Sequence, residues 1–230
     1  MNKQIWIFAV FATLVLACGN ADNSDKSVVP TSSSSDAVAD GGANVSNETT
    51  TASVVDPAFK PFDIYTDKGS ILNHYVPSGF MPDGKCVTLN ETWQEGCHSG
   101  KTCIRVVYGV QCSREDQQWA GVYWLNPANN WGHRKGGFNL TGAQKLTFWA
   151  KGESGGEQIS EFSVGGIANE YPDTDLASIG PVILSSEWRQ YTIDLRGKDL
   201  SYISGGFAWT ANVTANPESC IFYLDDIRFE

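Results

Sequence analysis

The stretch Lys145-Leu146-Thr147-Phe148-Trp149-Ala150-Lys151 decides the fold. Every second residue from 146 to 150 is apolar, whereas the residues at 145, 147 and 151 are polar. Successive side chains of a β-strand point to opposite faces, so the pattern predicts a strand with one buried and one solvent-facing side. Trp149 falls on the polar side. Residues 189–195 (Arg-Gln-Tyr-Thr-Ile-Asp-Leu) alternate in the same way and predict a second strand.

Similar short runs continue on both sides of these two strands, and Gly, Pro, Asn and Asp separate them. No window repeats apolar residues at the spacing of a helix. Short strands without intervening helices predict an all-β protein, a β-sandwich or jelly roll formed by one domain over residues 57–230. The further candidate strands are 102–108, 118–124, 159–165, 181–184, 205–210 and 220–229.

Composition narrows the possible functions. The chain has 230 residues, with 16 Lys and Arg against 26 Asp and Glu, and a formal net charge of −10. A nucleic-acid-binding protein needs a basic surface, so we expect no nucleic-acid partner. Aromatic residues make up 12% of the chain and include 8 Trp, which is atypical of a coiled coil or of a wholly disordered chain.

The first seventeen residues are typical of a secretory signal. Lys3 precedes an apolar run over residues 5–17, and a helix of that length covers about 20 Å, short of the roughly 30 Å hydrocarbon core. Leu14-Val15-Leu16-Ala17-Cys18 resembles the lipobox of bacterial lipoproteins, which implies cleavage after residue 17 and acylation of Cys18, with palmitate among the acyl chains. The alternative is an ordinary signal peptide with an incidental cysteine.

Residues 18–56 are predicted to be a disordered tether. Ser, Thr, Ala and Asn dominate this segment, which contains no aromatic residue. Such a composition cannot bury enough apolar area to offset the entropy of ordering. By the same lipoprotein resemblance, Gly19 after the cysteine implies sorting to the outer membrane. We therefore expect a monomeric domain that is lipid-anchored in the bacterial cell envelope, facing the periplasm or the cell surface.

Six cysteines agree with export to an oxidising compartment. Cys86 and Cys97 are the first candidate disulfide, because they would close a short polar loop that contains a tryptophan. The other pairing stays open. A zinc site is the alternative, although no CxxC spacing occurs and His74, His98 and His133 are scattered. The remaining cysteines after Cys18 are Cys103, Cys112 and Cys220.

Three segments resemble galactose-binding-like β-jelly-roll carbohydrate-binding modules, and the resemblance covers residues 59–230. They are Trp119–Trp124 with Leu140–Ala150, Trp188–Leu195, and the closing run Phe222–Phe229. The resemblance implies a jelly roll and non-catalytic binding of polysaccharide.

The same resemblance implies a structural Ca²⁺ where the last strand meets the N-terminal segment. Asp225 matches a ligand position of such modules, and Asp63 and Asp67 are candidate partners. Calcium takes six to eight oxygen ligands, so acidic residues are a suitable but unspecific signal. Solvated or backbone-capping carboxylates are the alternative.

A sugar site needs aromatic platforms flanked by amides, carboxylates and Arg, since sugars present flat C–H faces ringed by hydroxyls. The loop over residues 126–134 contains this mixture, and Trp149 and one face of residues 119–123 add aromatic side chains. Alternatively, the two Asn of the loop cap their own backbone. Core aromatics are expected at Trp124, Phe148, Phe207, Trp209 and Tyr223. The predicted carbohydrate-binding residues are Tyr123, Asn129, Asn130, Trp131, Arg134 and Trp149.

Two other functions remain open at this point. One is a structural or protein-interaction role for the lipoprotein domain. The other is a glycoside hydrolase, which requires two carboxylates across a cleft. No motif or spacing singles out such a pair, and no G-x-S-x-G motif marks a serine nucleophile. We therefore expect no enzyme. The candidate carboxylates are Glu153, Glu157, Glu161, Glu170, Asp173 and Asp194.

Overall fold

The computed structural model describes residues 59–82, 84–110 and 118–230. All described residues belong to one compact unit, Val54–Glu230. The predicted signal peptide, the predicted lipidation site Cys18 and the predicted tether lie outside the described residues. Within the described part of the chain, no helix has the length and apolar character needed to span a membrane.

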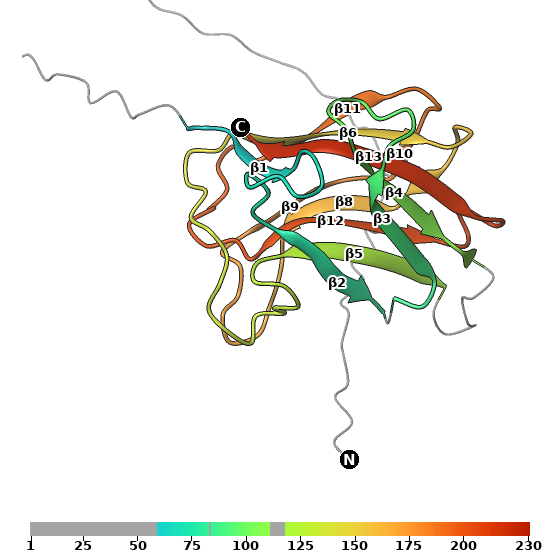
Figure 1. The fold of residues 1–230 in the computed structure, drawn as a ribbon. Helices are drawn as coiled ribbons and strands as arrows, with labels where there is room; N and C mark the ends of the chain where they lie inside the picture. The colour runs from blue at the N-terminus through green and yellow to red at the C-terminus, as the bar shows by residue number, and fades with distance from the viewer. Residues whose placement is uncertain (1–58, 83, 111–117) are drawn as a thin grey trace, which may run out of the picture. The chain divides into compact units, whose positions relative to one another are not determined.

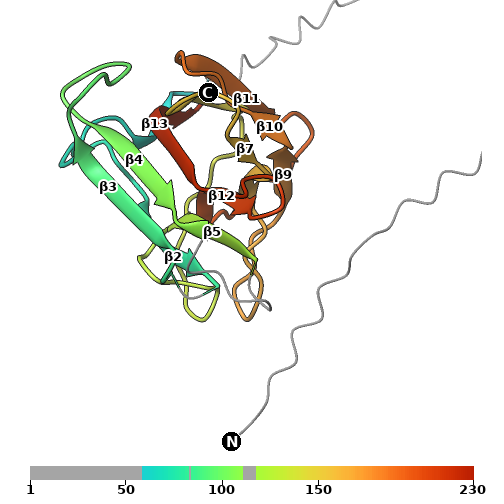
Figure 2. The same ribbon diagram turned by 90° about the vertical axis from the view of Figure 1, so that its right-hand side faces the viewer.

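The described residues form a β-sandwich jelly roll and contain no helix, which confirms the predicted fold class. The first sheet has the strand order β11-β6-β13-β4-β3, and β1 pairs with the end of β13. The second sheet has the order β2-β5-β12-β8-β9. In Figures 1 and 2, β3 and β4 of the first sheet lie side by side, with β2 and β5 of the second sheet below them.

The bounds of the strands are as follows. The first sheet contains β1 (Phe62–Tyr65), β3 (Val87–Trp93), β4 (Cys103–Tyr108), β6 (Lys145–Gly152), β11 (Arg189–Asp194) and β13 (Cys220–Phe229). The second sheet contains β2 (Val76–Met81), β5 (Trp119–Leu125), β8 (Glu161–Gly165), β9 (Leu176–Ile179) and β12 (Gly205–Asn212). A two-stranded sheet contains β7 (Gln158–Ile159) and β10 (Val182–Ile183).

The core lies between the two sheets, where the alternating pattern of β6 directs its apolar residues. Phe148 is fully buried and packs against Phe162 and Phe207 of the second sheet, with ring centroids 4.6 and 5.1 Å apart. Each such side chain contributes roughly 1.5–3 kcal/mol through burial. The polar face of the same strand, which carries Trp149, therefore points away from the core. We call this side of the first sheet its outer face.

Four strands were not predicted from the sequence, namely β1, β2, β3 and β9. Apart from β1, which pairs only with the end of β13, they are edge strands of the two sheets. β2 illustrates the cause, because it contains Pro77 and Gly79, which are depleted in strands. An edge strand tolerates a proline, since one of its sides needs no hydrogen-bond donor.

The predicted Cys86–Cys97 disulfide is wrong. Cys97 pairs with Cys103, with their Cα atoms 5.4 Å apart, and closes the loop between β3 and β4. Cys86 is disulfide-bonded as well, and Cys220 is a buried free thiol. Spacing along the chain could not identify the pairing, because the partner of Cys97 comes from the start of the next strand in the sheet.

Candidate functional site

A small open pocket of about 100 Å³ lies on the outer face of the first sheet. Cross-strand pairing builds it: Trp149 of β6 stands opposite Gln190 of β11 on one side and Asp225 of β13 on the other. An indole ring therefore lies beside an amide, a guanidinium, carboxylates and a hydroxyl. The pocket is lined by Thr147, Trp149, Gln190, Asp226, Arg228 and Glu230.

A β-bulge in β13 supplies two of the lining residues. Asp225 pairs with Trp149 and Arg228 pairs with Thr147, so β13 has one residue more than β6 over this stretch. Asp226, at φ 46°, is in the left-handed region that bulged residues often adopt. Strict alternation would place Asp225 and Arg228 on opposite faces. The extra residue brings both to the outer face, while Ile227 stays in the core.

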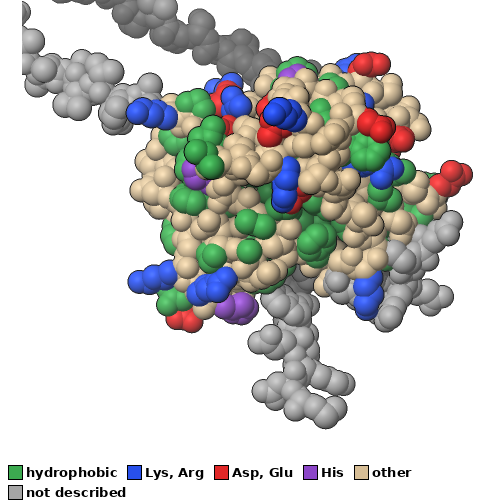
Figure 3. Space-filling model, viewed as in Figure 1, with side chains coloured by type: hydrophobic (Ala, Val, Ile, Leu, Met, Phe, Trp, Pro, Cys, Tyr) green, Lys and Arg blue, Asp and Glu red, His purple; other side chains and the backbone are tan. Residues whose placement is uncertain are grey.

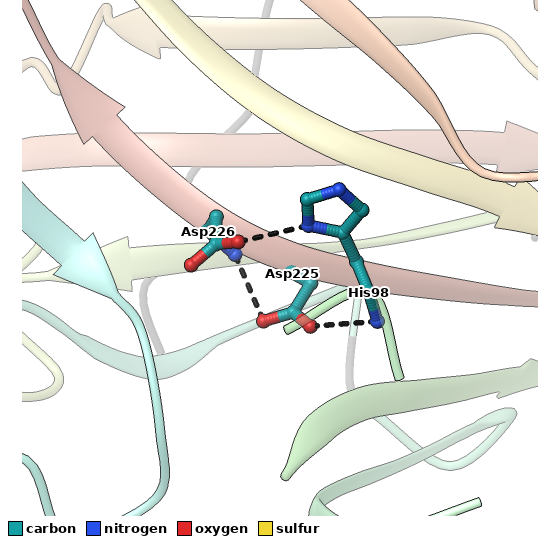
Figure 4. Close-up of side chains that lie close together, drawn as sticks. All are labelled: His98, Asp225 and Asp226. Carbon is teal, nitrogen blue, oxygen red and sulfur yellow. Dashed lines mark hydrogen bonds and ion pairs between the residues drawn. The ribbon is translucent and has the colours of Figure 1, made fainter. Parts of the chain in front are cut away.

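The β3–β4 loop, residues 94–102, folds over this pocket. The imidazole of His98 stacks on Trp149 with ring centroids 3.7 Å apart and planes 16° apart. Its Nδ1 lies 3.0 Å from Oδ2 of Asp226. The backbone amides of His98 and Ser99 both donate to Oδ2 of Asp225 at 3.1 Å. Figure 4 shows His98 reaching both aspartates of the bulge.

Asp225 is a fully buried carboxyl group with an altered acidity. Burial raises its pKa to about 6, and the nearby charge of Asp226 adds to the effect. Backbone hydrogen bonds from Ser99, Asp226 and His98 act in the opposite direction. Burial dominates because removing a carboxylate from water costs more than three amide donors return.

A second group of side chains crosses the outer face beside the pocket. Tyr223 of β13 pairs with Arg105 of β4 on one side and with Lys151 of β6 on the other. Nζ of Lys151 lies 4.9 Å from the ring centroid of Tyr223 and 5.3 Å from that of Trp188. The guanidinium of Arg105 lies 5.1 Å from the ring of Trp93. We call these five residues the cation–aromatic row.

The indoles of this row also hold the β3–β4 loop. Nε1 of Trp93 donates to the carbonyl of Glu95, and Nε1 of Trp188 donates to the carbonyl of Gly96, both at 2.8 Å. The loop is thus fixed by two indoles, by the buried Asp225 and by the Cys97–Cys103 disulfide. The β3–β4 loop therefore forms a fixed border along the aromatic side chains of the outer face.

The predicted binding residues fall on two different sheets. Trp149 lies in the pocket of the first sheet, whereas Tyr123 belongs to β5 of the second sheet and contacts Trp131, with ring centroids 5.8 Å apart. The structure therefore does not bring Trp149 together with the other five. Asn129 is exposed, and its backbone amide donates to Oγ of Ser78 at 2.9 Å.

Two residues of the 126–134 loop stabilise the loop itself. Asn130 is buried, and its side chain bonds both the carbonyl and the amide of Arg134, at 2.9 and 3.3 Å. The guanidinium of Arg134 in turn donates to the carbonyl of Ala128 at 2.9 Å. For Asn130, the backbone-capping alternative therefore accounts for its position.

The three predicted calcium ligands have three different environments. Oδ1 of Asp63 lies 3.1 Å from Nε of Arg228, and Oδ1 of Asp67 accepts backbone amides at 2.7 Å that lower its pKa. Within the described residues, the group close enough to share an ion is His98, Asp225 and Asp226. Asp63, Asp67 and Asp225 do not form one oxygen cluster as placed, and calcium binding stays a prediction.

Sequence reasoning missed most of the residues that the outer face assembles. Alternation indicated that Gln190 and Trp149 lie on polar faces, but it could not show that their strands are neighbours. Tyr223 was expected in the core; it is buried, yet it lies on the outer face beneath Trp93 and Trp188. No sequence signal marks the bulge that places Asp226 and Arg228.

No protein-family model matches the chain, and no curated protein matches it either. Solved structures do match: a family 30 carbohydrate-binding module has 14% identity, covers 74% of this chain and 98% of its own, with a TM-score of 0.49. A family 11 module of a cellulosomal cellulase from Clostridium thermocellum has 15% identity, covers 75% of this chain and 95% of its own, with a TM-score of 0.49.

A mutant of a family 29 carbohydrate-binding module is similar at 11% identity, covers 74% of this chain and 91% of its own, with a TM-score of 0.42. All three are carbohydrate-binding modules, the class that the sequence motifs resemble. Similarity at this level concerns the fold alone, because one fold hosts many functions. The ligand has to be inferred from the side chains of the outer face.

Proposed function

We propose that this protein binds polysaccharide, without cleaving it, on the outer face of its first sheet. The observation that supports this best is the pocket in which Trp149 stands beside Gln190, Asp226 and Arg228. His98 stacks on one face of this indole, so a sugar ring would place its C–H face against the part of Trp149 that lines the pocket. The amide, carboxylate and guanidinium groups suit the sugar hydroxyls.

The geometry favours an extended ligand over a compact one. The pocket is open to solvent, and five of its six residues come from the neighbouring strands β11, β6 and β13, with Glu230 directly after β13. The cation–aromatic row continues the same face over β4 to the loop after β3. A chain of sugars that lies across the strands would contact both groups, whereas a single small molecule would fill only the pocket.

The proposal includes a cellular setting. The protein is a monomeric lipoprotein of the bacterial cell envelope, anchored in the outer membrane through Cys18 and tethered by residues 18–56. The lipobox-like sequence and the Ser- and Thr-rich segment support this part of the proposal. An anchored binding domain would hold polysaccharide at the bacterial surface or in the periplasm.

The test compares the two aromatic faces of the protein. Trp149→Ala is expected to weaken polysaccharide binding about tenfold, through loss of a stacking contact on the order of 1–2 kcal/mol. Trp131→Ala, on the side of the second sheet, is expected to leave the affinity unchanged. Affinity electrophoresis in gels containing soluble polysaccharides, followed by titration calorimetry, measures both variants after thermal unfolding has shown that they are folded.

Three results would contradict the proposal. A loss of affinity in Trp131→Ala alone would place the site on the second sheet. Release of reducing ends from a bound polysaccharide would favour the glycoside hydrolase. Failure to bind any of a broad panel of glycans would favour the structural or protein-interaction role.

A further inference from the structure

Two half-buried cations on the outer face of the first sheet have no carboxylate partner. Within the described residues, six ion pairs form, and neither Arg105 nor Lys151 belongs to one. Arg228, the other half-buried cation, pairs with Asp63 at 3.1 Å. The other described Lys and Arg that form none of these pairs are exposed. The pair is unusual because half-buried charges are normally compensated.

Their surroundings are aromatic rather than acidic. Lys151 lies between the rings of Tyr223 and Trp188, and Arg105 lies over Trp93. Nε of Arg105 lies 3.3 Å from Oη of Tyr223 and donates to it. These contacts position the cations but provide few acceptor oxygens, so the remaining N–H groups of both side chains stay available.

One carboxylate lies close to the row, and it hydrogen-bonds to Tyr223 instead of pairing with either cation. Glu153 accepts the hydroxyl proton of Tyr223 through Oε2. Among the ion pairs of the described residues, none joins Glu153 to Arg105 or Lys151. Burial and this bond to Glu153 raise the pKa of Tyr223, so the phenol stays neutral. The central row therefore has two positive charges and an uncharged ring between them.

We infer that the polysaccharide bound by this face is acidic and carries carboxylates, as uronic acid polymers do; the inference rests on the proposed function. The aromatic rings of the row would contact sugar faces, and Arg105 and Lys151 would bind carboxylates on the sugars. A guanidinium binds a carboxylate with two parallel hydrogen bonds. The two cations are two strands apart, roughly 10 Å, so they would bind two groups along one extended chain.

The net charge of −10 strengthens the argument that these two cations have a specific role. An acidic polymer is repelled by the protein as a whole, so specific cations must provide the attraction. A neutral polysaccharide would leave the two half-buried charges without a carboxylate partner, with only aromatic rings, the hydroxyl of Tyr223 and water around them. The observations therefore favour the acidic polymer over a neutral one.

The experiment uses the purified full chain and two pairs of probes. Polygalacturonate and alginate are each compared with their carboxyl-reduced forms, which keep the same backbone without the charge. We expect at least tenfold tighter binding to one acidic polymer than to its reduced form. We also expect the preference to fall as NaCl rises from 50 to 500 mM, which shortens the Debye length about threefold, since ionic contacts are screened.

Variants assign the preference to the row. Lys151→Met and Arg105→Met are each expected to lose about tenfold in affinity for the acidic polymer and little for its reduced form. Arg105→Lys keeps the charge and is expected to retain most of the affinity. Lys135→Met removes an exposed charge from the 126–137 segment and serves as the matched control, with no change expected. Thermal unfolding verifies that each variant is folded.

The outcomes separate this inference from the proposed function. Equal or tighter binding of the reduced polymers would overturn the acidic ligand and leave polysaccharide binding intact. An acidic preference that survives in both Met variants would also overturn the assignment to these cations. Absence of binding to all four probes and to neutral glucans would overturn both proposals together.

Discussion

At the scale of single residues, Asp225 shows how burial changes chemistry. Its carboxyl is fully buried under the β3–β4 loop, and its pKa of about 6 lies above the usual value of 3.8. A group that binds its proton more tightly in the folded state stabilises that state in acid. The contribution of Asp225 is thus complete below about pH 3.8 and is lost as the pH rises through about 6.

This pH dependence can be measured against Asp225→Asn, which cannot titrate. Relative to the variant, the wild-type protein is expected to gain about 2.5 kcal/mol in free energy of unfolding between pH 7 and pH 4, since the pKa of Asp225 is about 6 in the folded state against 3.8. Urea denaturation at a series of pH values gives the difference. A constant difference over that range would show that Asp225 does not titrate there.

Residue type predicted the chemistry of the site better than its location. Trp149 was correctly assigned to a solvent-facing side because Lys145 and Thr147 share that side. For Asn130, amide chemistry allowed either ligand binding or loop capping, and only the contacts with Arg134 decided between them. A side chain in isolation does not reveal which partners it will meet.

At the scale of elements, the 126–134 loop depends on the backbone of Gly132. Its φ is 80°, and a Cβ added there would lie 1.8 Å from the carbonyl oxygen of Ala168. Gly197 has nearly the same φ, 77°, but an added Cβ meets nothing within 4 Å. A side chain at either position would have the strain of a left-handed backbone, but only a side chain at position 132 would also clash with its neighbours.

Alanine substitution at both positions tests this difference. Gly197→Ala is expected to cost about 1 kcal/mol from backbone strain alone, and Gly132→Ala roughly 3 kcal/mol because the segment around Ala168 must also move. The free energy of unfolding in urea reports both values. Equal losses in free energy of unfolding would mean that the loop accommodates the added methyl group without a steric penalty.

Strands with neighbours on both sides were predicted more completely than edge strands, with the regularly alternating edge strand β11 as an exception. β6, β12 and β13 have neighbours on both sides, and their patterns were recognised from sequence. The edge strands β2 and β9 were missed because few of their residues have to be apolar. The bulge in β13 could not be predicted either, since Asp225-Asp226 looks in the sequence like an ordinary break in alternation.

At the scale of the whole molecule, one aromatic core joins the two sheets. Phe148 of the first sheet packs on Phe162 and Phe207 of the second, so its removal should weaken the sandwich as a unit. Phe148→Ala is expected to cost about 3–5 kcal/mol, whereas Thr192→Ala, exposed on β11, should cost about 0.5 kcal/mol or less. Calorimetric unfolding tests this, and a small effect of Phe148→Ala would indicate sheets that are stable separately.

Charged side chains of both signs lie on the same face of the molecule. Figure 3 shows Lys and Arg side chains interspersed with Asp and Glu on one face. Recognition on a face of mixed charge depends on local groups rather than on a broad electrostatic field. This is why the proposed ligand class follows from two particular cations.

The sequence by itself determined the all-β fold, the alternating faces of its central strands and the kinds of side chain available for sugar binding. These are local properties, because the period of a strand and the preference of a turn depend on neighbours in the chain. Tertiary structure alone decided that Trp149 lies on the first sheet, whereas Trp131 contacts the second. It also decided that Cys97 pairs with Cys103 and that a bulge turns Asp225 and Arg228 to one face. Such outcomes depend on strand order and register, which arise when segments distant in sequence pack together to bury a common core.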